Sequence, residues 1–156
     1  MNSDNVEGEP LTILLVEDNP SHAEIVKRCL ENHRVANRII HIEDGQAALD
    51  YLYQRGAYSD PATYRKPHVI LLDLRLPKVD GVEILRQIKL EESLKDIPVV
   101  VLSSSQAEED ITKSYDFRAN SYLVKPVDFE KFESMMEDIG FYWLGWNRLP
   151  YNGEKL

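Results

Sequence analysis

Short apolar runs alternate along this chain with longer segments in which apolar residues recur every three or four positions. The runs are rich in Val, Ile and Leu, as strands buried on both faces are, and the segments between them have the period of helices that cover a sheet. This alternation predicts an α/β fold in which helices cover both faces of a parallel sheet. The strands are expected at residues 11–16, 38–42, 68–72, 97–102 and 121–124.

Turn-forming and capping residues indicate where the intervening helices begin. Asn19-Pro20, Asp44-Gly45 and Asp80-Gly81 each precede a segment of helical period. Asn and Asp are preferred N-caps, and Pro suits the first helical turn. We expect helices near residues 20–33, 45–52, 81–89 and 106–117.

The segment from Gln54 to Pro67 contains Gly, Ser, Asp and Pro without a clean period. This composition predicts a long exposed loop before the third strand. The loop is either a tolerated surface insertion, which costs little closure entropy, or a contact for a partner.

Composition and charge fit one ordinary domain and exclude several kinds of protein. The chain has 156 residues, 43% of them hydrophobic, and a formal net charge of -9. That charge argues against nonspecific binding to nucleic acid, which needs clustered Lys and Arg. Cys29 is the single cysteine, so an intrachain disulfide and a cysteine-rich zinc site are both excluded. A reducing compartment is therefore favoured.

The apolar runs are much shorter than the roughly 20 residues that a membrane span needs. The first ten residues also lack the apolar stretch of a signal peptide. We expect a cytoplasmic protein without a membrane partner. Its predicted parts are a flexible leader at 1–10, one domain at 11–139 and an aromatic C-terminal extension at 140–156.

Polar side chains stand at the carboxyl ends of four predicted strands. Glu17 and Asp18 follow the first strand, Asp73 the third, Ser103 the fourth and Lys125 the fifth. Ligands of parallel α/β sheets bind beyond the carboxyl ends of the strands, so these side chains are expected to converge. Each one alone has a plainer explanation as a turn former, an N-cap or a solvated charge. Their joint occurrence favours a functional site.

The three acids of this set would repel one another unless a cation lay between them. Mg²⁺ prefers oxygen ligands and usually binds one or two carboxylates, phosphate oxygen and several waters. We expect Asp18 and Asp73 to supply one oxygen each and the backbone carbonyl of Arg75 a third, with Glu17 holding a coordinated water. Ca²⁺ fits less well, because it takes more ligands.

An aspartate carboxylate can also act as a nucleophile toward a phosphoryl group. Asp73 is the acceptor that we expect. Phosphoryl transfer depends mostly on alignment and on electrostatic stabilisation of charge on the equatorial oxygens. Mg²⁺ and Lys125 can supply positive charge, and Ser103 can donate a hydrogen bond.

Taken together, these motifs resemble the receiver domains of two-component response regulators, chiefly the stand-alone CheY-like kind. The resemblance extends from Leu11 to Ile139. It rests on the segments Val16-Glu17-Asp18-Asn19-Pro20, Leu72-Asp73-Leu74-Arg75-Leu76-Pro77 with Asp80-Gly81, Val101-Leu102-Ser103-Ser104 and Tyr122-Leu123-Val124-Lys125-Pro126. It implies a flavodoxin-like, doubly wound sheet of five parallel strands in the order 2-1-3-4-5.

The resemblance also implies a role for each residue of the site. Asp73 would be the phosphorylated aspartate, Asp18 a direct Mg²⁺ ligand and Lys125 the phosphate-binding lysine. Ser103 would be the switch hydroxyl, drawn inward by the phosphoryl group, and Tyr122 the aromatic switch residue that fills the vacated space. A half-buried Tyr122 that does not move is the alternative.

By this resemblance, the chain is a single-domain response regulator that accepts a phosphoryl group from a sensor histidine kinase and has no DNA-binding output domain. It is not a conventional enzyme, although it assists its own Mg²⁺-dependent phosphorylation and dephosphorylation. The charged Arg75 is expected to alter the dephosphorylation rate. The signal would pass to a downstream protein or to a histidine phosphotransfer protein. The long loop and the aromatic extension resemble the regulators paired with phytochrome-type sensor kinases.

Apolar residues at the end of the chain recur in steps of three and four, as on one face of a helix. They are Phe129, Phe132, Met136, Ile139, Trp143 and Trp146. One interpretation is a homodimer whose contact includes Phe132, Met136, Trp143 and Trp146. The other is an extension that folds back over its own domain.

Three rival functions remain open from the residues alone. A binding module could keep the receiver fold without being phosphorylated. A Mg²⁺-dependent aspartyl phosphohydrolase of the dehalogenase type needs a second Asp two positions after the nucleophile, where Arg75 stands. A flavodoxin-like carrier needs Gly, Ser or Thr in its first loop, where Glu17-Asp18 stands.

Overall fold

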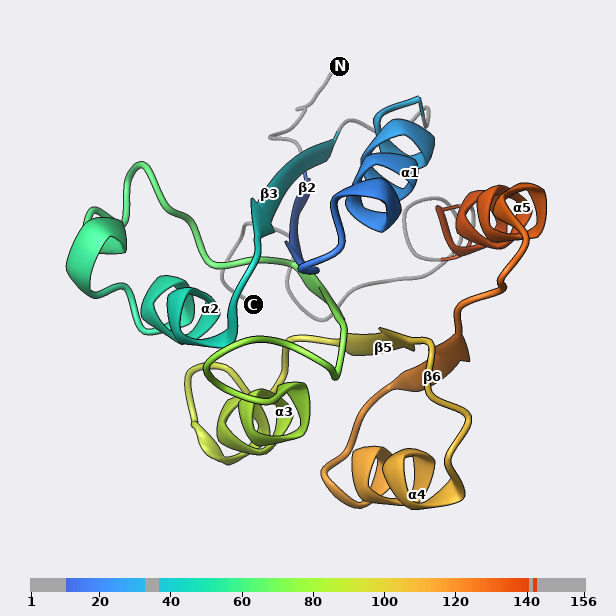
Figure 1. Cartoon of the computed structure of the whole chain (residues 1–156). Coiled ribbons are helices and arrows are strands. Elements are labelled where there is room, and N and C mark those ends of the chain that lie inside the picture. The colour runs from blue at the N-terminus through green and yellow to red at the C-terminus, as the bar shows by residue number, and fades with distance from the viewer. Residues whose placement is uncertain (1–10, 33–36, 141, 143–156) are drawn as a thin grey trace.

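The computed structural model describes residues 11–32, 37–140 and 142 (Figure 1). Strands and helices alternate along these residues, as the apolar pattern predicts. The elements are β2 (Leu11–Val16), α1 (Pro20–Glu31), β3 (Asn37–Ile42), α2 (Gly45–Leu52), the 3-10 helix η1 (Gly56–Tyr58), β4 (Val69–Leu72), α3 (Gly81–Leu90), β5 (Val99–Ser103), α4 (Glu108–Asp116), β6 (Ser121–Val124) and α5 (Phe129–Gly140).

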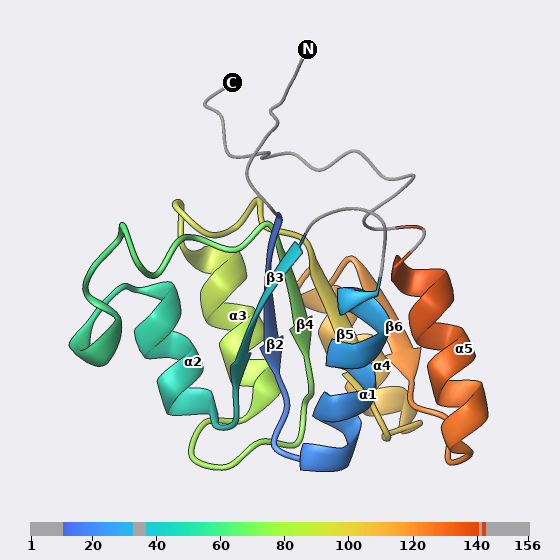
Figure 2. The ribbon, with the colours of Figure 1, turned by 90° about the horizontal axis from the view of Figure 1, so that it is seen from above.

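The strands of the described residues form one five-stranded sheet in the order β3-β2-β4-β5-β6, and each neighbouring pair is parallel. In Figure 2 the strands run in the same direction. Counted along the chain, this order is 2-1-3-4-5, which confirms the predicted flavodoxin-like, doubly wound fold. The polar residues that follow β2, β4, β5 and β6 are therefore brought to one edge of the sheet.

Helices cover both faces of the sheet, with α1 and α5 on one face and α2, α3 and α4 on the other (Figures 1 and 2). Side chains of β2 alternate between the two apolar layers. Ile13 and Leu15 pack with α1 and α5, whereas Leu14 and Val16 pack with α2 and α3. This two-sided burial explains why the strands are nearly continuous apolar runs.

The helix starts that we predicted from capping residues are confirmed. Asn19 Oδ1 accepts hydrogen bonds from the backbone nitrogens of Ser21 and His22. Asp44 and Asp80 cap α2 and α3 in the same way. Each cap satisfies backbone N–H groups that have no partner within the helix.

Some ends of elements differ from the prediction by one or two residues. β5 begins at Val99 rather than at 97, because Pro98 has no N–H to donate and only its carbonyl bonds to β4, accepting from Ile70 N at 3.0 Å. The strand also includes Ser103, which we placed just after it. α4 begins at Glu108 rather than at 106. The predicted end of the first helix near His33 lies outside the described residues.

Gly81 allows α3 to begin directly against the end of β4. A Cβ atom at this position would lie 2.4 Å from the carbonyl oxygen of Asp73 and 2.5 Å from Cα of Leu74. The Gly81 nitrogen donates to the Leu74 carbonyl at 2.9 Å. A larger residue here would displace the backbone that carries Asp73.

Phe132 and Met136 belong to the core of the monomer. Their side chains are 1% and 0% exposed and pack with α1 and the sheet. The period of three and four correctly predicted a helix with one apolar face, α5, but that face packs on the core of its own chain. These two side chains are therefore not available for a dimer contact, and Trp143 and Trp146 lie outside the described residues.

Among the described residues, no helix has the length and apolar character that a membrane span requires.

Three tyrosines hold the segment before β4, which we predicted as a long exposed loop. Tyr51 of α2 is buried, and the rings of Tyr58 and Tyr64 meet it edge to face at centroid distances of 5.4 and 6.1 Å. Tyr51 also donates its hydroxyl to the Arg65 carbonyl at 2.6 Å. Burial raises the pKa of Tyr51 to about 12. Although many residues of the segment are exposed, it is anchored on α2.

Replacing one of these rings tests the anchor. We expect Tyr64→Ala to lower the free energy of unfolding by about 1–3 kcal/mol, because aromatic contacts and apolar burial are lost. Tyr64→Phe keeps the ring and should stay within about 0.5 kcal/mol of the native value. Urea unfolding measures both values. Equal stability of Tyr64→Ala and Tyr64→Phe would show that the ring does not hold the segment.

Candidate functional site

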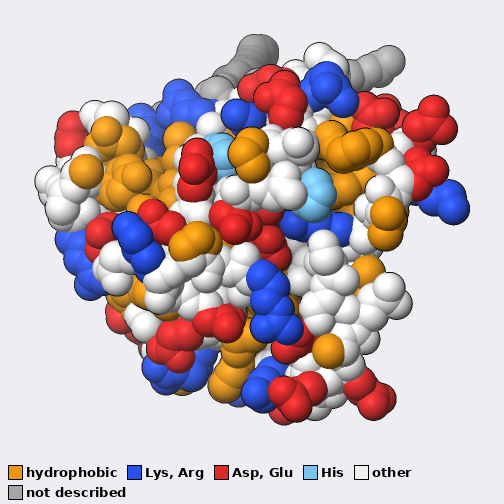
Figure 3. Space-filling view, viewed as in Figure 1, with side chains coloured by type: hydrophobic (Ala, Val, Ile, Leu, Met, Phe, Trp, Pro, Cys, Tyr) orange, Lys and Arg blue, Asp and Glu red, His pale blue; other side chains and the backbone are white. Residues whose placement is uncertain are grey.

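The candidate site lies at the edge of the sheet where β2, β4, β5 and β6 end. Backbone hydrogen bonds join the residues beyond these strands, since Asp73 N donates to the Val16 carbonyl at 3.0 Å and Lys125 N donates to the Ser103 carbonyl at 2.8 Å. Figure 3 views this edge and shows acidic side chains near the middle of the face, with a histidine close by. The polar strand ends therefore converge as the parallel topology requires.

Glu17, Asp18 and Asp73 form the acidic cluster of the site. Each residue offers one carboxylate oxygen, and these oxygens lie within 4.8 Å of one another. Glu17 and Asp73 are buried, whereas Asp18 is exposed and gives solvent access to the cluster. A set of hard oxygen donors with access to water fits Mg²⁺ or a similar divalent cation.

The backbone of Arg75 lies beside this cluster. Its amide nitrogen donates to Asp73 Oδ1 at 3.3 Å. This contact orients the carboxylate of Asp73. Cation binding by the Arg75 carbonyl remains a prediction.

Lys125 is the basic residue of the site, and its side chain is only 3% exposed. Its ammonium nitrogen lies 2.6 Å from Glu17 Oε1, 3.3 Å from Asp73 Oδ2 and 3.1 Å from His22 Nδ1. These three contacts match the three N–H donors of an ammonium group. The ammonium therefore joins the two buried acids and also contacts α1.

Burial raises the pKa of Glu17 to about 7, although the hydrogen bond and the charge of Lys125 oppose this shift. The nearby charge of Asp73 raises the pKa further. The Lys125 ammonium is thus insufficient to keep Glu17 fully charged at neutral pH. A cation bound at the cluster would favour the charged form of Glu17.

Ser103 and Tyr122, which we predicted as switch residues, both contact Ser105. Ser103 is buried at the end of β5, and its hydroxyl oxygen accepts from Ser105 N at 3.2 Å. Tyr122 is half-buried and donates its hydroxyl to the Ser105 carbonyl at 2.9 Å. The two side chains are therefore linked through the loop that connects β5 to α4.

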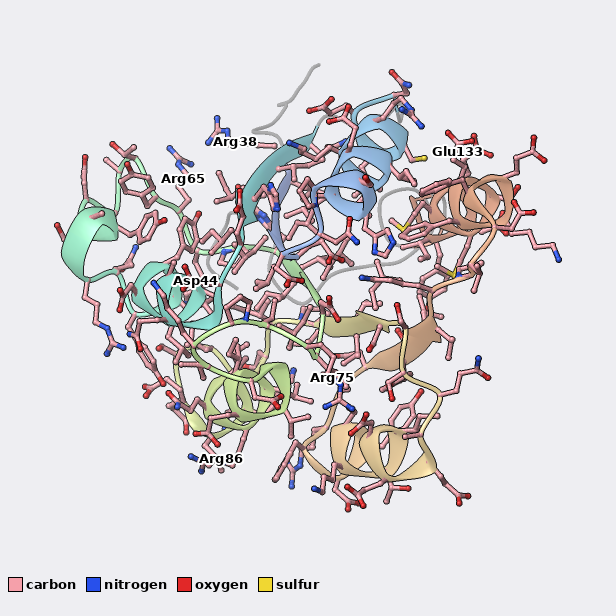
Figure 4. The ribbon with its side chains drawn as sticks, in the orientation of Figure 1. Arg38, Asp44, Arg65, Arg75, Arg86 and Glu133 are labelled. Atoms are coloured by element: carbon pink, nitrogen blue, oxygen red, sulfur yellow. The ribbon has the colours of Figure 1, made fainter. Side chains whose placement is uncertain are left out.

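Two residues of the site were not found by sequence reasoning. Asp110 of α4 forms an ion pair with the Arg75 guanidinium and accepts from Ser105 Oγ at 2.6 Å; Figure 4 shows Arg75 pointing toward α4. His22 of α1 contacts Lys125. Asp110 is one of three acids in the first turn of α4. Acids are common at this position because they interact favourably with the helix dipole, so the sequence does not single out Asp110. The sequence gives no signal that His22 faces the site.

Comparison with known proteins agrees with the geometry. The sequence profile of the response regulator receiver domain matches residues 13–137. The chain is 49% identical over 144 residues to the probable methanogenesis regulatory protein FilR2 of Methanothrix harundinacea, covering 91% of this chain and 89% of that protein. It is 40% identical over 141 residues to response regulator Rcp1 of Synechocystis sp., covering 90% and 94%.

Similar solved structures include the Mn²⁺-bound form of Rcp1, with a TM-score of 0.87 and 39% identity, covering 91% of this chain and 100% of that one. The phosphorylated cyanobacterial phytochrome response regulator RcpA also has a TM-score of 0.87 and 39% identity, covering 92% and 100%. The resemblance inferred from the motifs is thus confirmed. Because the receiver profile spans most of the chain and these relatives match it nearly end to end, the chain belongs to the response regulator receiver domain family.

Proposed function

We propose that this response regulator accepts a phosphoryl group on Asp73 from the phosphohistidine of a sensor histidine kinase and then signals through protein contacts. The observation that carries the proposal is the pairing of the buried Asp73 carboxylate with the Lys125 ammonium, at 3.3 Å, beside two further acids. This arrangement provides a nucleophile, positive charge and a cation site at one point. It supports phosphoryl transfer better than it supports hydrolysis with a second acid, since Arg75 occupies that position.

In the transfer step, a carboxylate oxygen of Asp73 forms a bond to phosphorus while the phosphorus–nitrogen bond of the phosphohistidine breaks. The leaving imidazole nitrogen keeps the bonding electron pair and takes up a proton. Charge develops on the equatorial phosphoryl oxygens, where fixed positive groups lower the barrier. Lys125 supplies one such group, and the buried Ser103 hydroxyl can donate a hydrogen bond to the same oxygens.

The acidic cluster is the proposed site of Mg²⁺. Asp18 and Asp73 would hold the ion directly, together with the Arg75 carbonyl, and Glu17 would hold a coordinated water. Bound there, Mg²⁺ would neutralise the charge shared by the acceptor carboxylate and the phosphoryl oxygens. The same groups would assist hydrolysis of the acyl phosphate, so the protein would also promote its own dephosphorylation without being a conventional enzyme.

The proposed switch starts at Ser103. A phosphoryl group on Asp73 would attract the Ser103 hydroxyl by a charge-assisted hydrogen bond. Ser103 Oγ already bonds to Ser105 N, and Tyr122 bonds to the Ser105 carbonyl. A movement of this loop would therefore release or shift Tyr122 and change the surface formed by α4, β6 and α5.

We infer the nature of the partners from relatives. RcpA is described as a phytochrome response regulator, which supports a phytochrome-type kinase for this chain. The phosphorylated form would then bind a downstream protein or a histidine phosphotransfer protein. The proposed location is the cytoplasm, where such kinases present their phosphohistidine.

The acceptor is tested by intact mass after incubation with acetyl phosphate and Mg²⁺. The native chain should gain one phosphoryl group, and Asp73→Asn should gain none, because an amide is a poor nucleophile. Asp80→Asn is the matched control: Asn keeps the cap of α3, so this variant should be phosphorylated as the native chain is. A native chain that gains no mass, even from a phosphorylated kinase, would favour a phosphorylation-independent binding module.

The cation site is tested by calorimetric titration with Mg²⁺ and Mn²⁺. Asp18→Asn should weaken binding by at least about tenfold, because a charged ligand is replaced by a neutral one. Glu31→Gln removes the same charge at the far end of α1 and should bind like the native chain. Equal affinity in Asp18→Asn and the native chain would rule out Asp18 as a ligand.

We also propose that the chain forms a homodimer through the extension at residues 140–156. The core takes up Phe132 and Met136, which leaves Trp143 and Trp146 as the next apolar residues of the same period. Sedimentation velocity at micromolar concentration should show a dimer for the native chain and a monomer for the double variant Trp143→Ala/Trp146→Ala. A native chain that is monomeric with and without phosphorylation would contradict the dimer.

A further inference from the structure

His22 is attached to the site at two points. Its Nδ1 lies 3.1 Å from Lys125 Nζ. An ammonium group has no lone pair, so Nδ1 must accept this hydrogen bond and the neutral ring carries its proton on Nε2. The backbone nitrogen of His22 donates to Asn19 Oδ1 at 3.1 Å, and Asn19 N donates to Glu17 Oε2 at 3.1 Å.

These bonds form a closed ring of four residues. Lys125 donates to both Glu17 and His22, while Asn19 connects the backbone of His22 to the second oxygen of Glu17. The imidazole also packs against the buried Phe132, with ring centroids 5.4 Å apart. Its position is thus fixed by the start of α1 and by α5 together.

His22 differs from the other two acceptors of the Lys125 ammonium. Glu17 and Asp73 belong to the acidic cluster, so a bound cation competes with Lys125 for their charge. Phosphorylation of Asp73 also converts that carboxylate into an acyl phosphate. Burial and the charge of Lys125 lower the pKa of His22, which favours the neutral imidazole that the contact with Lys125 requires. The imidazole is not part of the acidic cluster, so neither event acts on it directly.

We propose that His22 is a positioning residue, which holds the Lys125 ammonium toward the phosphoryl group while a cation and the phosphoryl group engage the neighbouring carboxylates. This inference rests on the proposed function of Asp73. The role needs a hydrogen-bond acceptor at the place of Nδ1, and it does not need an imidazole as such. A residue of similar size without an acceptor should therefore fail, and one with an acceptor should succeed.

Phosphorylation rates with acetyl phosphate and Mg²⁺, followed by intact mass, test this requirement. His22→Leu keeps an apolar contact with Phe132 but should be phosphorylated about tenfold more slowly, as the loss of one hydrogen bond to a charged group implies. His22→Asn can present Oδ1 to Lys125 and should stay within about threefold of the native rate. Lys27→Leu introduces the same side chain elsewhere on α1 and should react as the native chain does.

The proposal is overturned if His22→Leu reacts at the native rate, or if His22→Asn is as slow as His22→Leu, because the second result would assign His22 a packing role only. Side-chain ¹⁵N NMR at pH 7 gives a readout that does not depend on phosphorylation. It should show His22 protonated on Nε2, with a change in the Nδ1 signal in Lys125→Met. A ring protonated on Nδ1 would also overturn the proposal. A native chain that is not phosphorylated would instead disprove the function of Asp73.

Discussion

The organisation of the site depends on one buried ammonium group, that of Lys125. A buried charge is costly unless it is paired and hydrogen-bonded, and Lys125 meets this requirement with Glu17, Asp73 and His22. The pairing is incomplete in charge, because one ammonium faces three carboxylates. Burial raises the pKa of Glu17 to about 7, and the nearby charge of Asp73 adds to the shift. On the proposed function, a cation bound at the cluster would offset this excess of negative charge.

The parallel sheet brings this ammonium to the acids. Glu17, Asp73 and Lys125 are far apart in the chain, and each follows a strand that ends at the same edge. The backbone bond from Asp73 to Val16, at 3.0 Å, continues the pairing of β2 and β4 into the site. Close approach at Gly81 then fixes the backbone behind Asp73. The proposed acceptor is thus held by regular structure, so little rearrangement would be needed before phosphoryl transfer.

Much of this arrangement could be predicted because its signals are local in sequence. The strands, the helix caps and the residues at strand ends follow from short-range patterns, and parallel topology converts them into a common site. His22 and Asp110 could not be predicted, since their role depends on which way a helix is rotated when it packs. The tyrosine anchor was missed for a related reason. Tyr64 lies in a segment without periodicity, and its packing on Tyr51 is a tertiary contact.

Helical period alone also could not assign a partner to the apolar face of α5. The pattern correctly indicates one buried face, but it does not distinguish a monomer's core from a dimer contact. Phe132 packs against His22 of α1, so this part of the apolar face of α5 belongs to the core of the monomer. Because the Phe132 ring belongs to the core and also contacts His22 beside the candidate site, α5 and α1 meet next to that site.

A signalling domain also needs an element whose two arrangements differ little in free energy, because a ligand can shift an equilibrium only by its differential affinity. The contacts between the site and α4 fit this condition. They include an ion pair between Arg75 and Asp110, whose side chains are 62% and 11% exposed, and one hydrogen bond from Ser105 to Asp110. Tyr122 of β6 bonds to the Ser105 carbonyl, in the loop that leads to α4. Single hydrogen bonds contribute modestly to stability, and so does an ion pair whose cation stays in solvent. In contrast, β2, β4 and β5 are held by the apolar core on both faces. On the proposed function, the boundary between a rigid acceptor and an adjustable surface would therefore lie at Ser103, the last residue of β5.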